Sequence, residues 1–124
     1  MDKYIAMCDC EEIQEQWKPN SGSRYIIRGN DRVAFGIPGY FEYRNNYIWL
    51  PRQENIQEMW KKDHPDHEDG IPDNWTTVFI DEFHEWAMAG DFDKSLLFAP
   101  MDSLQIAFYM YEIYKKTWTE KGWS

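Results

Sequence analysis

Four short runs of β-branched and aromatic residues follow one another in the first half of the chain, and they constrain the fold most strongly. They cover residues 24–28, 32–37, 40–43 and 47–50. The segments between them are rich in Gly, Asn, Asp and Pro, residue types that favour tight turns at hairpin spacing. This pattern predicts an antiparallel sheet of three or four strands.

Helical patterns lie on both sides of these runs. Ile13 and Trp17 are four residues apart and Pro19 follows them, which predicts one amphipathic helix that ends near Trp17. Pro51 ends the last strand, and the apolar spacing after it predicts a helix over residues 53–62. The segment that follows, residues 64–73, contains two prolines and a glycine, and we expect a solvated loop there.

Two further helices are expected after this loop. The first is capped by Thr76 or Thr77 and ends at Gly90, because glycine readily adopts the left-handed conformation that terminates helices. Its apolar face contains Phe79, Phe83, Trp86 and Ala87, and Asp81, Glu82 and Glu85 are expected to lie off that face.

The last helix is expected to begin with Asp102 and Gln105 as a variant capping box and to run to about Trp118. It is apolar nearly all round, so it is expected to be central to the core or shared with a second copy of the chain. The fold class is therefore α+β: a small antiparallel sheet packed against about four helices, with the C-terminal helix central. At 124 residues, one domain over 1–124 is expected, as a monomer or homodimer.

Charge is distributed unevenly along the chain, whose formal net charge is −9. Residues 24–52 carry two acidic and five basic side chains, whereas residues 53–93 carry twelve acidic and only two basic ones. A net acidic protein is repelled by phosphate backbones, so direct nucleic-acid binding is disfavoured and a basic protein surface is the favoured partner. The candidate partner-binding residues are Asp63, Asp66, Glu68, Asp69, Asp73, Asp81, Glu82, Glu85, Asp91 and Asp93, with Trp60 or Trp75 as an aromatic anchor.

A nucleic-acid accessory function is the first alternative. Arg24, Arg28 and Arg32, together with Tyr25 and neighbouring rings on the predicted sheet, would form a basic aromatic platform on which single-stranded bases stack. The competing interpretation is that strand alternation buries the rings and leaves the arginines as ordinary edge charges.

A small zinc-binding protein is the second alternative. Cys8, Cys10, His64 and His67 are the one plausible four-ligand set in the sequence, because tetrahedral zinc prefers thiolate and imidazole ligands. The spacing of the cysteines is shorter than is usual for structural zinc, so no cofactor is expected. Their close spacing also disfavours a disulfide, which fits a reducing cytoplasm.

Catalytic motifs are absent from the sequence, so a non-enzymatic protein is expected. There is no nucleophile elbow of the G-x-S-x-G type and no glycine-rich phosphate loop. His84 between Glu82 and Glu85 could form an acid–base cluster, but residues one or two apart on a helix point in different directions. No apolar stretch reaches the length of a membrane span, and the first residues do not have the pattern of a signal peptide.

Several motifs resemble those of an uncharacterised family of short phage and prophage proteins. The similarity begins with Met7-Cys8-Asp9-Cys10 and includes a W-L-P-R-Q-x3-Q-E-M element over residues 49–59. It ends with an S-L-x2-A-F-x-M-x3-Y-x-K-x-W pattern over residues 103–118. The family has no assigned activity. The resemblance implies a protein in the cytoplasm of a bacterial host that occupies a host protein, such as a counter-defence inhibitor of the anti-CRISPR or anti-restriction type.

Overall fold

The fold is that of a computed structural model, which describes residues 2–30, 32–39, 45–65, 70–90 and 92–124. The chain divides into two compact units, residues 1–52 and residues 53–124. We call them the sheet unit and the helical unit and describe each by itself. In these described residues, five α-helices, a three-stranded antiparallel sheet and a two-stranded sheet confirm the α+β class. The single domain expected from the sequence stays a prediction.

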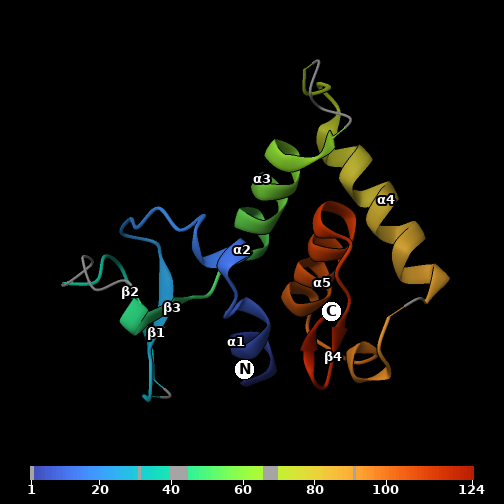
Figure 1. The fold of residues 1–124 in the computed structure, drawn as a ribbon. Helices are drawn as coiled ribbons and strands as arrows, with labels where there is room; N and C mark the ends of the chain where they lie inside the picture. Colours follow the sequence, from blue (N-terminus) through green and yellow to red (C-terminus); the bar gives the residue numbers. More distant parts are fainter. Residues whose placement is uncertain (1, 31, 40–44, 66–69, 91) are drawn as a thin grey trace. The chain divides into compact units, whose positions relative to one another are not determined.

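The described part of the sheet unit contains three short strands in the order β2-β1-β3 (Figure 1). Strand β1 (Arg24–Ile27) is central and pairs antiparallel with β2 (Val33–Phe35) and β3 (Tyr47–Trp49). These three strands confirm three of the four predicted runs. The fourth run, residues 40–43, lies outside the described residues. Tyr25 faces inward, where its ring contacts Trp17 and Tyr47 at centroid distances of 5.6 and 5.5 Å.

Two short helices, α1 (Asp2–Cys8) and α2 (Glu11–Gln14), precede the sheet where the sequence predicted one. The prediction was wrong because Cys10 adopts an extended conformation between them, with φ −144° and ψ 156°. The break allows Gln14 to reach strand β3. Its side-chain amide donates to the Trp49 carbonyl at 2.9 Å and accepts from the Trp49 N–H at 2.8 Å. Gln14 thereby completes the hydrogen bonds of an edge strand, whose backbone groups would otherwise need solvent.

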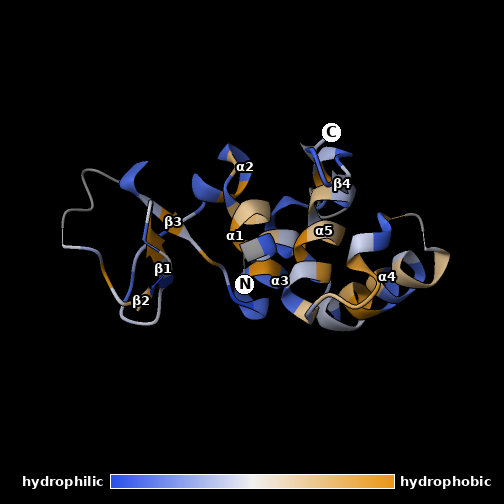
Figure 2. Ribbon diagram, turned by 90° about the horizontal axis from the view of Figure 1, so that it is seen from below, coloured by the Kyte–Doolittle hydropathy of each residue, from blue (hydrophilic) through white to orange (hydrophobic). Residues whose placement is uncertain are grey.

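The helical unit is built from α3 (Gln53–Asp63), α4 (Trp75–Ala89) and α5 (Met101–Tyr114), with a short 3-10 helix at Lys94–Leu96 before α5. Helix α5 contacts both α3 and α4, and it buries Ser103 and every residue from Gln105 to Met110. Its hydrophobic ribbon is visible in Figure 2. Phe108 of α5 packs edge-on against Phe79 of α4, whose ring in turn packs edge-on against Trp60 of α3. The core of this unit is therefore a chain of aromatic contacts that joins the three helices.

The ends of α4 and α5 test the capping predictions. Gly90 is left-handed with φ 70° and ends α4 as expected, although Asn74 rather than a threonine precedes the helix. The capping box at Asp102 is wrong: Pro100 is the N-cap residue. Gln105 is buried and hydrogen bonds with Gln53 and Gln57 of α3. A buried amide needs such partners, and they prevent it from reaching back to the helix start.

The extent of α5 also differs from the prediction. The helix ends at Tyr114 rather than near Trp118, because Lys115 adopts a left-handed conformation with φ 57°. The chain then forms a hairpin from β4 (Trp118–Thr119) and β5 (Gly122–Trp123), and Gly122, directly after the turn, has φ 105°. In the part of the chain that the structure describes, no helix combines the length and apolar character needed to cross a bilayer.

Candidate functional site

Three ionisable side chains converge in the helical unit, one from each of its long helices. His64 directly follows α3, Glu82 lies in the second turn of α4 and Glu112 lies near the end of α5. One nitrogen or oxygen atom of each lies within 4.8 Å of the others. His64 Nε2 is 3.3 Å from Glu82 Oε2. We call these three residues the His–Glu–Glu cluster.

Packing of the helical core positions the cluster. The backbone N–H of His64 donates to the carbonyl of Trp60 at 3.0 Å, which fixes His64 to the last turn of α3. The imidazole lies beside the indole of Trp60, with ring centroids 4.9 Å apart, and only 10% of its side chain is exposed. Glu82 follows Phe79 by three residues, so it lies on the same inward side of α4. The aromatic core therefore fixes two of the three side chains.

The electrostatics of the cluster disfavour two separate negative charges. Burial raises the pKa of Glu112, and so do the nearby charge of Glu82 and a hydrogen bond with it. The charges of His64 and Lys115 act in the opposite direction. Glu82 Oε2 is buried and accepts no hydrogen bond from any residue within the described ranges. Two adjacent carboxylates of this kind are stabilised by a shared proton or by a cation.

The acidic residues predicted to bind a partner fall into three groups. Asp73, Asp81 and Glu85 are exposed, as predicted. Three others make internal contacts: Asp63 accepts from the Tyr109 hydroxyl, Glu82 belongs to the His–Glu–Glu cluster, and Asp93 accepts from the Ser95 N–H at 2.9 Å. Asp66, Glu68, Asp69 and Asp91 lie outside the described residues.

Neither proposed aromatic anchor is freely exposed. Trp60 is completely buried, so its prediction as an anchor is wrong: as the ring that joins α3 to Phe79 it belongs to the core. Trp75 is half-buried, with the Lys61 ammonium 4.8 Å from its ring centroid. This cation–π contact ties the first turn of α4 to α3.

The basic aromatic platform expected on the sheet is not formed by its predicted residues. Tyr25 is buried, which excludes it as a stacking surface. Arg24 donates to the carbonyls of Leu50 and Pro51. Arg28 forms a bidentate ion pair with Asp9, with nitrogen–oxygen distances of 2.7 and 2.9 Å. Arg32 is exposed. Two of the three arginines thus stabilise the sheet unit.

The sequence-predicted zinc set is divided between the units. Cys8 and Cys10 belong to the sheet unit, where Cys8 is buried, and His64 belongs to the helical unit. His67 lies outside the described residues, so this four-ligand set stays a prediction. The acid–base cluster around His84, which helix geometry disfavours, is not formed, because His84 is exposed on α4 whereas Glu82 lies beside His64.

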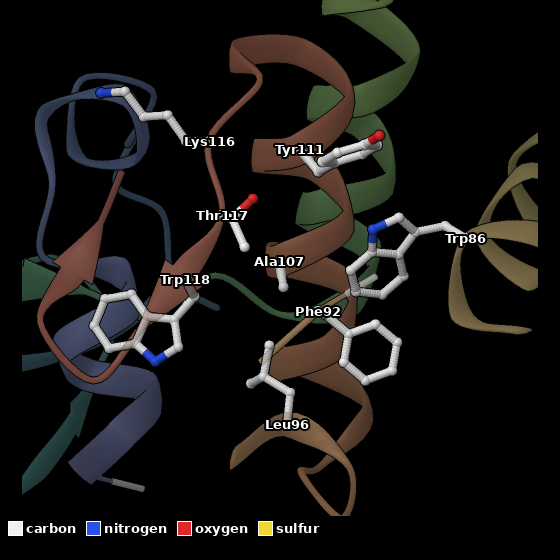
Figure 3. Close-up of a pocket in the computed structure, with 8 residues that line it drawn as sticks. All are labelled: Trp86, Phe92, Leu96, Ala107, Tyr111, Lys116, Thr117 and Trp118. Atoms are coloured by element: carbon white, nitrogen blue, oxygen red, sulfur yellow. The ribbon is translucent and has the colours of Figure 1, made fainter. Parts of the chain in front are cut away.

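A small pocket in the helical unit lies between α4, α5 and the segment after α5 (Figure 3). Aromatic rings, including Trp86, Phe92 and Trp118, form much of its lining. Its volume is about 10 Å³. That is room for a single water molecule at most, so the pocket is far too small for a metabolite.

Glu112 is the functional candidate that sequence reasoning missed. It interrupts the apolar run of the last helix, and an acidic residue in such a run is the signal that could have identified it. The sequence alone could not show that Glu112 meets His64 and Glu82, because the three are separated by a loop and by whole helices.

Comparison with known proteins identified no relative. No family model matches the chain, and neither a curated protein nor a solved structure matches it. The resemblance to short phage proteins stays a hypothesis.

Proposed function

We propose that the chain is a non-enzymatic interaction protein whose helical unit docks on a basic protein surface. The observation that carries this proposal is the division of charge between the units. Residues 1–52 contain seven acidic and seven basic side chains, whereas residues 53–124 contain fifteen acidic and six basic ones. The whole net charge of the protein therefore belongs to the helical unit. Such a field accelerates association with basic surfaces and repels phosphate backbones.

The outer side of α4 is the favoured contact surface. Its exposed residues combine two carboxylates, Asp81 and Glu85, with two large apolar side chains, Ile80 and Met88. Ile80 is 57% exposed and Met88 73% exposed. Asp81, Glu85 and Met88 are three or four residues apart and share one side of the helix, and Ile80 lies at the edge of that side. We call these four residues the outer α4 face; the ribbon of α4 carries both hydrophobic and hydrophilic colours in Figure 2. Apolar groups supply desolvated contact area and carboxylates supply orientation, the combination found in protein interfaces.

The partner best matched to this face is a protein with a basic groove, such as a nucleic-acid-binding protein. Carboxylates on a helix substitute for phosphates in a groove of that kind. The resemblance to phage proteins supports a bacterial host protein as the partner, in the host cytoplasm. Occupation of the groove would make the chain a counter-defence inhibitor of the anti-CRISPR or anti-restriction type.

A competition experiment tests this function. The tagged full chain is used to retain proteins from a nuclease-treated bacterial lysate, and a retained protein is then purified and its affinity measured. We expect duplex DNA to displace the chain, because both occupy the same groove. We also expect Asp81→Lys with Glu85→Lys to abolish binding, since charge reversal turns attraction into repulsion.

The matched control is Glu54→Lys with Glu120→Lys. Both residues are exposed and lie in the helical unit, so the net charge changes equally. The control should retain most of the affinity. The proposal is contradicted if no protein is retained, if DNA does not compete, or if both double variants lose affinity equally.

A further inference from the structure

We propose that His64, Glu82 and Glu112 bind a divalent transition-metal cation, which ties α3, α4 and α5 together at one point. This site shares only His64 with the zinc set predicted from the sequence, and it uses no cysteine. It is also independent of the docking proposal, which concerns the opposite side of α4.

The first argument is the convergence of the ligand atoms. One imidazole and two carboxylates arise from three helices that the aromatic core already holds in contact. Their ligand atoms lie within 4.8 Å of one another. Zinc–nitrogen and zinc–oxygen distances near 2.1 Å place tetrahedral ligands roughly 3 to 4 Å apart. The side chains therefore need to approach by about one ångström, which rotamer adjustments supply without helix movement.

The second argument is the unmet need for positive charge. Glu82 Oε2 is buried, and no described residue donates a hydrogen bond to it. His64 Nε2 lies 3.3 Å from this oxygen, on a side chain that is nine-tenths buried. A cation held beside His64 would supply Glu82 Oε2 with the positive charge that it lacks. The net negative charge of the helical unit raises the local concentration of cations further.

The third argument concerns the class of ion. One nitrogen and carboxylate oxygens suit zinc and its neighbours among the divalent transition metals, whereas calcium and magnesium prefer sites of oxygen alone. Three protein ligands leave a fourth position for water, as in an open zinc site. The chain contributes this ligand set from the inner side of its helices, so binding should stabilise the helical unit.

Zinc titration of the full chain tests the site. The protein is freed of metal with a chelator, and Zn²⁺ binding is measured by calorimetry. We expect one ion per chain and a rise in the thermal unfolding midpoint, because a ligand that binds the native state stabilises it. His64→Gln, Glu82→Gln and Glu112→Gln should each weaken binding by at least about tenfold.

Two controls separate this site from other sources of zinc binding. His84→Gln and Asp81→Asn change the same residue types at exposed positions of α4, and both should keep the wild-type affinity. Co²⁺ in place of zinc should show no thiolate charge-transfer absorption, whereas binding at Cys8 and Cys10 would produce it.

Circular dichroism of each metal-free variant establishes that the variant is folded. Glu82→Gln and Glu112→Gln each remove like-charge repulsion between the two carboxylates and should fold at least as well as the wild type. The proposal is overturned by zinc binding weaker than about 1 mM. It is equally overturned by affinity that survives all three ligand substitutions, by equal loss in the His84→Gln control, or by a thiolate signal.

Discussion

Asp81 and Glu82 are neighbours in the sequence with the same charge, yet they lie in opposite environments of α4. Asp81 is exposed beside Glu85 on the outer face, whereas Glu82 lies beside His64 and Glu112. One residue along a helix is a rotation of about 100°, which is enough to move a side chain from solvent to the packed side. Composition alone would assign both residues to one acidic surface. The helix instead places Asp81 in solvent and Glu82 in the His–Glu–Glu cluster.

The same comparison applies to the apolar residues of α4. Phe79 is buried against Trp60 and Phe108, whereas its neighbour Ile80 is exposed. The inner side of the helix should therefore determine stability, and the outer side should be free to determine contacts with other molecules. The predictions that follow test this division, beginning with the largest effect.

Replacement of Phe79 by alanine should produce the largest loss of stability. Removal of a fully packed ring leaves a cavity between α3 and α5 and costs about 3–5 kcal/mol. Urea unfolding followed by circular dichroism measures the change. Ile80→Ala is the matched control and should change the free energy of unfolding by about 0.5 kcal/mol or less. Equal losses in the two variants would show that α4 has no distinct inner side.

Glu112→Gln should stabilise the metal-free protein in a pH-dependent way. Burial and the charge of Glu82 raise the pKa of Glu112 above its ordinary value of 4.5. A carboxyl with a raised pKa in the folded state contributes stability that is present below pH 4.5 and is lost as the pH rises through its folded pKa. The variant should therefore equal the wild type below pH 4.5 and exceed it near neutral pH.

Urea unfolding at several pH values, with a chelator present, measures that difference. Glu120→Gln, at an exposed position, is the control and should show no pH-dependent gain. A Glu112→Gln variant that is less stable than the wild type near neutral pH would contradict the account.

Neutralisation of the two carboxylates on the outer α4 face should produce the smallest change in stability. Asp81→Asn and Glu85→Gln remove exposed charges and should each alter the free energy of unfolding by about 0.5 kcal/mol or less. Thermal unfolding measures the effect. A loss as large as that of Phe79→Ala would show that these carboxylates support the fold rather than a partner.

The fold was predictable where local chemistry decides it. The three described strands, the helix after Pro51 and the end of α4 at Gly90 all follow from turn residues, apolar spacing and glycine conformation. The errors arose where tertiary contacts prevail over local signals. Gln105 looked like a capping residue but bonds with α3, and the helical pattern up to Trp118 ends earlier at a left-handed Lys115.

The candidate site was less predictable than the fold. Sequence reasoning assigned His64 to a possible zinc set and Glu82 to the partner-binding acids, so it did not pair them with each other or with Glu112. Glu82 turns away from His84 because the helical periodicity places it near Phe79, on the packed side. Glu112 could be noticed as a charge within an apolar helix, whereas its meeting with the other two depends on how three helices pack.

The central claim is that α4 divides its acidic residues between an inner and an outer side. The most direct test is a zinc titration of the protein in which nuclear magnetic resonance follows the carboxyl and imidazole signals. Addition of Zn²⁺ to the metal-free full chain should shift the carboxyl signals of Glu82 and Glu112 and the ring signals of His64. The carboxyl signals of Asp81 and Glu85 should stay in place. Equal shifts at the inner and outer residues, or shifts at the outer residues alone, would contradict the account.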